Sequence, residues 1–206
     1  LTAMGAIVMG GTSQEFTRFA IAETALIAGA DPVFGLNTLG GALSLRTKDG
    51  TAFPGTSIQI GGGSFGRKTA DFEHGGSRRA FDWYVASGLF FEDGWRDVSP
   101  TNVRQFFGRG GWRNERTSIG LTLGYANNAL IGNALQELTL LSRNYASVYT
   151  TPDITANRAP SINLQIRHAF SPRVSLSGNA YFRHVRSRLF NGDVNENSLD
   201  QTVYQP

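Results

Sequence analysis

The chain has 206 residues, a formal charge of +3 and no cysteine, which excludes a disulfide framework, thiolate metal sites and a cysteine nucleophile. Charged residues make up only 17% of the chain, too few for disorder or for a solvated helical bundle. Because the basic residues form no block, nucleic-acid binding is not expected. The 25 glycines and 14 phenylalanines suit strands joined by tight turns better than helices.

The first 50 residues differ in character from the rest. The apolar runs Ala3–Gly11 and Phe19–Ala30 are too short and too interrupted by charge for a transmembrane helix. The stretch Asp31–Gly50 is rich in turn residues, and within it Ala42–Lys48 alternates like a strand that closes on an Asp-Gly turn. We therefore expect a boundary between two units at Lys48–Gly55.

Beyond this boundary the main signal is period-two alternation. In Thr117–Asn127, Ile119, Leu121 and Leu123 fall on one face, and small or polar residues fall on the other. The pattern predicts about seven strands. They are expected at residues 57–64, 68–74, 81–91, 103–113, 117–127, 161–170 and 173–186.

The predicted connections alternate between short and long. Short turns are expected at 75–79, 114–116 and 171–173, and longer links at 92–102, 128–160 and after 189. This rhythm, with strands of roughly 10 residues, is typical of an up-and-down membrane β-barrel. A soluble β-sandwich also alternates and is the main alternative. Two features favour the membrane: the polar face is small and rich in hydroxyls and amides, and aromatic residues gather near strand ends. Those aromatics are Phe65, Phe81, Trp83, Phe90, Phe91, Trp95, Trp112, Tyr125 and Phe170.

No motif predicts an enzyme, and we assign no catalytic, cofactor-binding or metal-binding residue. The sequence GGGSFGRKT at Gly61–Thr69 departs from a phosphate-binding loop because Arg67 precedes Lys68-Thr69, so a hairpin is the better interpretation.

The histidines, expected near strand ends, are His74, His168 and His184, and none has a partner at metal-ligand spacing. The carboxylates are Asp31, Asp71, Glu73, Asp82, Glu92, Asp93 and Asp97, and the cluster Glu92–Asp97 is interpreted as a solvated loop, with a cation contact as the lesser alternative. The basic clusters Arg78-Arg79 and Arg183, Arg186 and Arg188 fit turn solvation or contact with lipopolysaccharide phosphates.

The segment PVFGLNTLGGALSLRTKDG, Pro32–Gly50, resembles the end of the plug domain of TonB-dependent outer-membrane receptors, with the Phe-Gly-x-Asn-Thr-x-Gly-Gly order intact at Phe34–Gly41. Later segments are similar to early strands and outer loops of the barrel in that family: Phe90–Pro100, Val103–Arg113, Leu130–Glu137, Val148–Arg158, Leu176–Arg188 and Phe190–Glu196. The resemblance covers about residues 30–206. Residues 1–24 match nothing in the family, and Ala25–Asp31 departs from its charged pattern.

The resemblance implies an all-β fold, a partial transmembrane antiparallel up-and-down β-barrel preceded by a plug remnant. Residues 1–50 would be the C-terminal remnant of the plug, with 1–30 unassigned, and residues 51–206 the N-terminal part of the barrel. Barrels of this class have about 22 strands, so about seven strands would form an open curved sheet. The chain looks cut at Leu1 and at Pro206, and the TonB box, most of the plug and the closing C-terminal strand are expected to lie outside it.

The function that the resemblance implies is active import of a scarce ligand across the bacterial outer membrane. The cargo would be a ferric siderophore or a similar iron or cobalamin complex. The partners would be the TonB–ExbB–ExbD complex, outer-membrane lipid and lipopolysaccharide. Ligand-binding residues cannot be transferred from the family, and Asn37 and Arg46 are expected to serve structure. The alternatives are a passive porin-type barrel and a soluble β-sandwich binding module.

Overall fold

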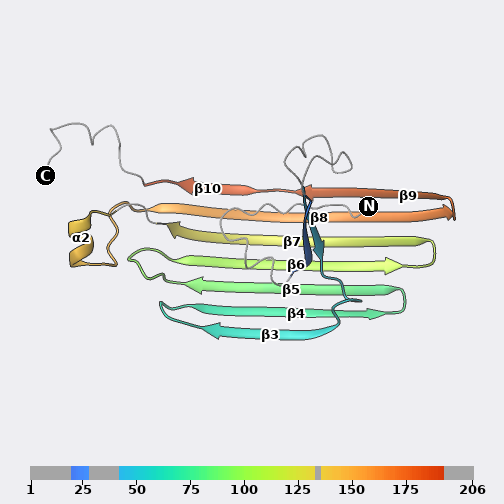
Figure 1. Cartoon of the computed structure of the whole chain (residues 1–206), viewed down its shortest axis with the longest axis horizontal. Coiled ribbons are helices and arrows are strands. Elements are labelled where there is room, and N and C mark those ends of the chain that lie inside the picture. The colour runs from blue at the N-terminus through green and yellow to red at the C-terminus, as the bar shows by residue number, and fades with distance from the viewer. Residues whose placement is uncertain (1–19, 28–41, 133–135, 193–206) are drawn as a thin grey trace.

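A computed structural model describes residues 20–27, 42–132 and 136–192 of the chain. The described residues are mostly β: a two-stranded sheet, a main antiparallel sheet of eight strands and one short helix (Figure 1). The two-stranded sheet pairs β1 (Ile21–Ile27) with β2 (Ala42–Thr47), and the helix is α2 (Leu138–Arg143). None of the described helices is long and apolar enough to cross a membrane.

The main sheet is an antiparallel meander that stays open. Its strands are β3 (Gly55–Gly62), β4 (Lys68–Arg78), β5 (Phe81–Glu92), β6 (Thr101–Arg113), β7 (Thr117–Gly132), β8 (Asp153–Ser171), β9 (Val174–Arg183) and β10 (Arg186–Phe190). Each strand from β3 to β8 pairs with the next along the chain. Both β9 and β10 pair with β8, in one continuous register on either side of a break at His184–Val185. The prediction of about seven long antiparallel strands is therefore confirmed, with β9 and β10 as two halves of the last.

The two ends of the sheet differ in their connections (Figure 1). At the end that we call the short-turn end, the links are 79–80, 114–116 and 172–173; at the long-loop end, they are 63–67, 93–100 and 133–152. Two expected boundaries are wrong. The turn expected at 75–79 lies at Arg79–Ala80 because β4 continues to Arg78. The link expected at 128–160 is shorter than expected and runs from 133 to 152, because β7 runs to Gly132 and β8 begins at Asp153.

The hairpin predicted at Gly61–Thr69 is confirmed. Strand β3 ends at Gly62, β4 begins at Lys68, and the two strands pair residue by residue up to that point. Gly66 in the turn has φ of 70°, in the left-handed region where glycine is least strained. The glycine-rich sequence therefore supplies a tight turn, and no helix follows it.

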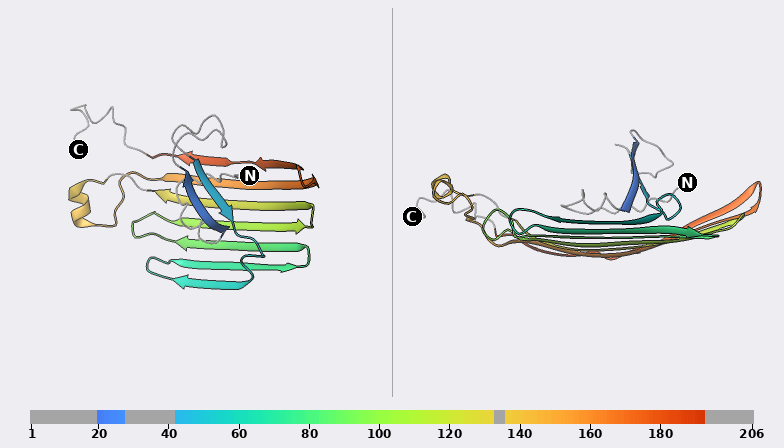
Figure 2. Two further views of the ribbon diagram at one scale, coloured as in Figure 1. Left: turned by 45° about the vertical axis from the view of Figure 1, so that its right-hand side comes forward. Right: turned by 90° about the horizontal axis from the view of Figure 1, so that it is seen from below.

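The main sheet is curved, and β1 and β2 lie over its concave side (Figure 2). The strand predicted at Ala42–Lys48 is confirmed by β2, and the Asp-Gly turn after it is also present. Asp49 Oδ1 accepts hydrogen bonds from the backbone N–H groups of Thr51, at 3.0 Å, and Ala52, at 2.9 Å. This turn connects the two-stranded sheet to β3. The remaining predictions for Asp31–Gly41 lie outside the described residues.

The buried core is small and lies between the two sheets. It consists of Ala20, Tyr84, Ala86 and Phe107, with the Tyr84 and Phe107 rings 6.2 Å apart. All three residues from the main sheet face β1 and β2, whereas the opposite side of the sheet has no cover among the described residues. The fold thus leaves one broad face of the main sheet open.

Candidate functional site

The strand register sorts the side chains of the main sheet onto two faces. Residues paired across an antiparallel ladder share a face, and successive residues of one strand alternate between faces. One row across five strands carries Trp83, Gly110, Leu121, Leu164 and Ala180. The next row, on the other face, carries Tyr84, Arg109, Thr122, Asn163 and Tyr181. We call these the apolar face and the polar face. The polar face contacts the segment that follows β2. Because β1 and β2 lie over the concave side of the sheet (Figure 2), the polar face is the concave one.

The apolar face exposes large aliphatic side chains. Ile60 is 82% exposed and Ile58 66% exposed, although both belong to a regular strand. Further exposed members of this face are Leu121, Leu123, Ile162, Leu164, Ile166, Leu176 and Phe182. A contiguous apolar surface of this size on a folded sheet indicates contact with a partner or with lipid.

Aromatic residues lie on the apolar face toward both of its ends. Toward the short-turn end lie Phe81, Trp112, His168 and Phe170, and toward the long-loop end lie Phe72, Phe106 and Tyr125. His168 packs edge-on against Phe170 with ring centroids 4.6 Å apart, and its Nδ1 lies 2.8 Å from the Thr117 hydroxyl. Aromatic rings with a polar edge in two bands are typical of surfaces at membrane interfaces.

A part-buried polar contact joins the polar face to the segment that leads into β3. Lys48 Nζ donates to Glu73 Oε2 at 2.7 Å, and the Tyr84 hydroxyl donates to the same oxygen at 2.5 Å. The Tyr84 side chain is 1% exposed, and the Lys48 ammonium lies over its ring. One carboxylate therefore joins the end of β2 to strands β4 and β5.

A second ion-pair group lies beside the first. Arg109 Nη1 lies 3.2 Å from Asp82 Oδ2 and 3.8 Å from Asp49 Oδ2, so β6 also contacts the turn after β2. Between the two groups, Gly50 sits where an added Cβ would lie 2.0 Å from the Trp83 carbonyl oxygen. Glycine at this position lets the backbone of the connecting segment lie directly on the sheet.

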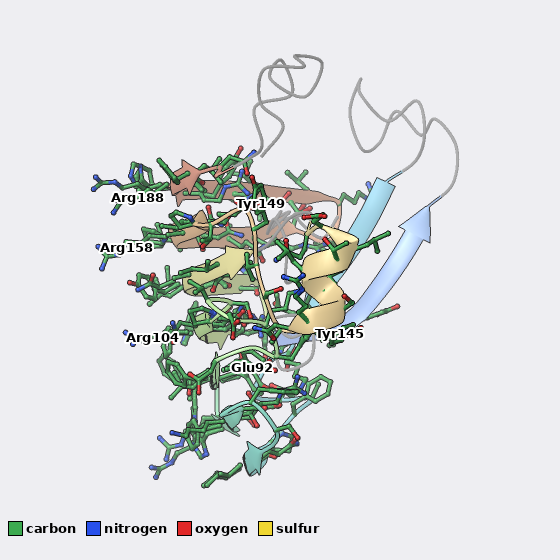
Figure 3. The ribbon with its side chains drawn as sticks, turned by 90° about the vertical axis from the view of Figure 1, so that its left-hand side faces the viewer. Glu92, Arg104, Tyr145, Tyr149, Arg158 and Arg188 are labelled. Atoms are coloured by element: carbon green, nitrogen blue, oxygen red, sulfur yellow. The ribbon has the colours of Figure 1, made fainter. Side chains whose placement is uncertain are left out.

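At the long-loop end, two loops that are distant in sequence form one cluster. The Trp95 and Tyr145 rings stack with centroids 5.3 Å apart, and Asp97 N donates to Ala146 O at 2.8 Å. Asn144 Nδ2 donates to Asp97 Oδ2 at 3.3 Å. Tyr145 and Tyr149 lie beside α2 in Figure 3, with both side chains largely exposed. Exposed aromatic rings on ordered loops offer a contact surface for a ligand arriving at this end.

The interpretation of Glu92–Asp97 as a solvated loop is wrong for its first residue. Glu92 is the last residue of β5, and its side chain is 16% exposed. Its carboxylate forms an ion pair with Arg67 at 3.0 Å, which ties the 63–67 turn to β5. Within the described ranges no group of three His, Asp or Glu side chains could hold a metal ion.

The predicted special residues do not converge on one site. His74 lies within β4 rather than near its end, with Nδ1 2.9 Å from the Thr56 hydroxyl, while His184 occupies the break between β9 and β10. Arg46 makes a long, exposed contact of 3.9 Å with Glu23. Asn37 and Asp31 lie outside the part of the chain that the structure describes.

The basic cluster expected at Arg183, Arg186 and Arg188 is divided between the two faces. Arg183 pairs with Ser161 on the polar face, whereas Arg186 pairs with Arg158 on the apolar face. Sequence reasoning also missed Lys48, Tyr84 and Arg109, which organise the polar face. A large tyrosine among small residues on a polar face was the available signal for that contact.

Comparison of the sequence with protein-family models and with curated proteins finds no match.

Proposed function

We propose that the chain is part of a TonB-dependent outer-membrane receptor. In this proposal the main sheet is one section of the barrel wall, and the segment from Ala20 to Gly50 is the end of the plug. The observation that carries the proposal is that the two faces of one curved sheet differ in chemistry. The convex face is apolar and uncovered among the described residues, and the concave face is polar and anchors the preceding chain through Lys48, Glu73 and Arg109.

The dimensions of the apolar face support a membrane setting. On β8, His168 lies toward the short-turn end and Arg158 toward the long-loop end, ten residues apart on the same face. Ten residues of strand span about 34 Å, and a tilt of about 40° reduces this to a height of about 26 Å. The apolar band of outer-membrane barrels is about 25 Å tall. The strand lengths therefore suit a crossing of the outer membrane.

The position of the two-stranded sheet argues against a soluble β-sandwich. In a sandwich, the second sheet covers the apolar face, because burying that face stabilises the fold. Here β1 and β2 lie over the polar face, and Lys48 and Asp49, directly after β2, form ion pairs with Glu73 and Arg109 of the main sheet. A small sheet on the polar side leaves the apolar face still in need of a partner.

The same contacts favour a plugged receptor over an open porin. The concave side of a porin lines a water-filled channel. In this chain the concave side carries a buried aromatic core and the ion pairs of Lys48 and Asp49. Because this anchor directly precedes β3, we expect the end of the plug to stay on the wall while the movement driven by TonB–ExbB–ExbD takes place in residues before Ala20.

The long-loop end suits capture of the cargo. Residues 93–100 and 136–152 of the two loops contact each other and expose Trp95, Tyr145 and Tyr149. In the proposed orientation this cluster faces outward and contacts the ferric siderophore or the similar iron or cobalamin complex. The outer membrane has no energy source of its own, so import against a gradient requires the inner-membrane complex.

The proposal is tested by uptake in bacteria that carry the full-length gene. Radiolabelled ferric hydroxamate, ferric catecholate and cobalamin are supplied to cells with and without the gene, and with and without TonB. We expect accumulation of one complex that needs both the gene and TonB. Accumulation that is independent of TonB would favour the passive porin, and a protein that stays in solution after removal of the membranes would contradict both barrel hypotheses.

A further inference from the structure

A small cavity lies on the polar face of the main sheet at its short-turn end. Its volume is about 130 Å³, and its lining comes from the segment after β2, the β4–β5 hairpin and the end of β6. The lining residues are Thr51, Ser77, Arg79, Ala80, Phe81, Asp82 and Arg113. Because a cavity of this size holds several water molecules, it also admits a solute of a few heavy atoms.

Glycine at position 50 brings the segment after β2 against this end of the sheet. A Cβ added at Gly50 would lie 2.0 Å from the Trp83 carbonyl oxygen, so the backbone passes directly over β5. The next residue, Thr51, donates its backbone N–H to Asp49 Oδ1 at 3.0 Å, which holds it in this position. One wall of the cavity therefore belongs to the connecting segment, and the other walls belong to the main sheet.

The walls of the main sheet carry two arginines that the backbone brings together. Arg79 lies in the two-residue turn between β4 and β5, and Arg113 is the last residue of β6. The backbone N–H of Arg113 donates to the Ala80 carbonyl oxygen at 2.8 Å, so the turn and the end of β6 are adjacent. Two arginines and two hydroxyl-bearing residues, Ser77 and Thr51, thus line one cavity.

The backbone at Arg79 has a conformation that favours glycine. Its φ is 55°, in the left-handed region where Cβ is crowded against the following carbonyl oxygen. Residues with strained backbone gather at active sites and at sites that clamp a ligand. Arginine at this position places a cation at the cavity, although glycine would relieve the strain.

The charges around the cavity leave both arginines without a carboxylate partner. Asp82 also lines the cavity, but its Oδ2 lies 3.2 Å from Arg109 Nη1, and Arg109 also lies 3.8 Å from Asp49. In the described ranges no Asp or Glu side chain lies within ion-pair distance of Arg79 or Arg113. Three arginines therefore surround two carboxylates, and this part of the polar face keeps a net positive charge.

The hydrogen-bond donors around the cavity suit an oxyanion of the phosphate type. Each guanidinium group can donate two parallel N–H bonds, and the hydroxyls of Ser77 and Thr51 can each donate one more. A tetrahedral oxyanion has four oxygens to accept these bonds, whereas a carboxylate has two. The volume is below the roughly 300–1,000 Å³ of pockets for drug-sized ligands, so a ferric siderophore or cobalamin does not fit.

We propose that Arg79 and Arg113 bind a small phosphate-type oxyanion in this cavity, and that the bound anion fastens the segment after β2 to the main sheet. An anion held by Thr51 on one wall and by the arginines on the other must leave before the segment detaches. Binding of the anion and attachment of the segment therefore strengthen each other. The site lies on the concave face, so its ligand arrives from water and not from the lipid proposed to contact the convex face.

The test uses the purified full-length protein with inorganic phosphate as the probe. Binding is measured by titration calorimetry, with sodium chloride at equal ionic strength as the blank, because salt screens exposed charges. Trypsin cleavage after Lys48 reports detachment of the segment, because this side chain is part-buried against Glu73. At a phosphate concentration ten times the Kd, cleavage should slow about elevenfold, because the anion must first dissociate.

Three variants separate binding of the anion from folding. The double variant Arg79→Gln with Arg113→Gln removes both cations, and its affinity for phosphate should fall at least about tenfold. Arg79→Gly removes one cation and relieves the left-handed φ, so it should lose affinity without losing thermal stability. Arg78→Gln is the matched control, because Arg78 precedes Arg79 but pairs with Phe81 on the apolar face, and its affinity should equal that of wild type.

Three binding results would overturn the site. They are phosphate binding no stronger than that of chloride, wild-type affinity in Arg79→Gly or in the double variant, and an equal loss of affinity in Arg78→Gln. Phosphate binding that leaves cleavage after Lys48 unchanged would contradict the fastening of the segment. Neither measurement depends on uptake, so a negative result removes this site and leaves the proposed import function to its own test.

Discussion

Lys48 and Glu73 form a part-buried ion pair, with 2.7 Å between Nζ and Oε2, that joins the end of β2 to the concave face of the main sheet. The residues are 25 positions apart, and the same carboxylate oxygen also accepts a hydrogen bond from Tyr84. This relationship links the two sheets and holds the described residues of β1 and β2 on the concave side of the main sheet (Figure 2).

Replacement of Lys48 by Met should loosen the end of β2 from the sheet. The change leaves the part-buried carboxylate of Glu73 with one partner fewer, which costs roughly 1–3 kcal/mol. Hydrogen exchange of the Lys48-position amide, which donates to Ala20 O at 2.9 Å, reports the detachment. Arg46→Met is the matched control, because its contact with Glu23 is long and exposed. Equal exchange in the two variants would contradict the role of the Lys48 contact.

Gly50→Ala should disturb the same junction by a different mechanism. The new Cβ would lie 2.0 Å from the Trp83 carbonyl oxygen and 2.2 Å from that of Gly76, so backbone must move. Overpacking of this kind costs roughly 1–3 kcal/mol. The measured quantity is protease sensitivity of the segment before β3. Gly110→Ala, where an added Cβ meets nothing within 4 Å, should leave that sensitivity unchanged. A Gly50→Ala protein as resistant as wild type would show that the segment does not lie on the sheet.

A cross-link between the two sheets tests whether the anchor moves during import. These 206 residues contain no cysteine, so Lys48→Cys with Glu73→Cys introduces one reactive pair into this part of the protein; any cysteine elsewhere in the full-length protein is first replaced by serine. Because we expect the plug to shift only upstream of this anchor, a short bifunctional thiol reagent should leave at least half of the TonB-dependent uptake. The control is the same double variant without the reagent. Complete loss of uptake on cross-linking would mean that the anchor itself must open.

Loss of the Trp95 ring should uncouple the two loops at the long-loop end. In Trp95→Ala the stack with Tyr145 disappears, a change of about 1 kcal/mol beyond the area lost. The amide of Asp97, bonded to Ala146 O, should then exchange faster. Tyr149→Ala removes another exposed loop aromatic and should not affect that amide. If both variants exchange alike, the stack does not order the loops.

The strands of the main sheet were the most predictable part of the fold. Alternation in β7 and β8 identifies the middle segments of these strands, because aliphatic residues there face one side only. The extensions of these strands were missed, since Asn127, Asn128 and Asn157 differ little in polarity between faces. These extensions are strands because they pair with neighbouring strands, which is a long-range property. The local alternation of polar and apolar residues gives no signal there.

The division of the basic cluster between the two faces follows from the sequence. Arg183 and Arg186 are three residues apart, so in one continuous strand they must point to opposite faces. By contrast, the Lys48–Glu73–Tyr84 contact depends on where the two-stranded sheet lies over the main sheet. Neither the composition nor the alternation of the sequence determines how the two sheets lie on each other. The contact of Lys48, Glu73 and Tyr84 could therefore not be predicted from the sequence.

A charge placed on the apolar face tests its proposed contact with lipid. Leu121→Lys should make the free energy of insertion into lipid vesicles less favourable by roughly 2–4 kcal/mol, because a lysine near the middle of the bilayer loses its hydration. Thr122→Lys, at the next residue of β7 but on the polar face, should insert normally. Insertion is measured as the protease-protected fraction. Equal loss in both variants would point to a general folding defect.

The central claim is that the convex face contacts lipid, and cysteine scanning along β7 tests it most directly. Single cysteines are placed in turn at Ser118, Ile119, Gly120, Leu121, Thr122 and Leu123 of the full-length protein in outer membranes. We expect the labelling to alternate from one residue to the next. Cysteines at positions 119, 121 and 123 should react with a lipid-dissolved probe and not with a membrane-impermeant thiol reagent. Cysteines at positions 118, 120 and 122 should not react with the lipid-dissolved probe. Uniform reaction with the aqueous reagent, or the same lipid reactivity at odd and even positions, would contradict it.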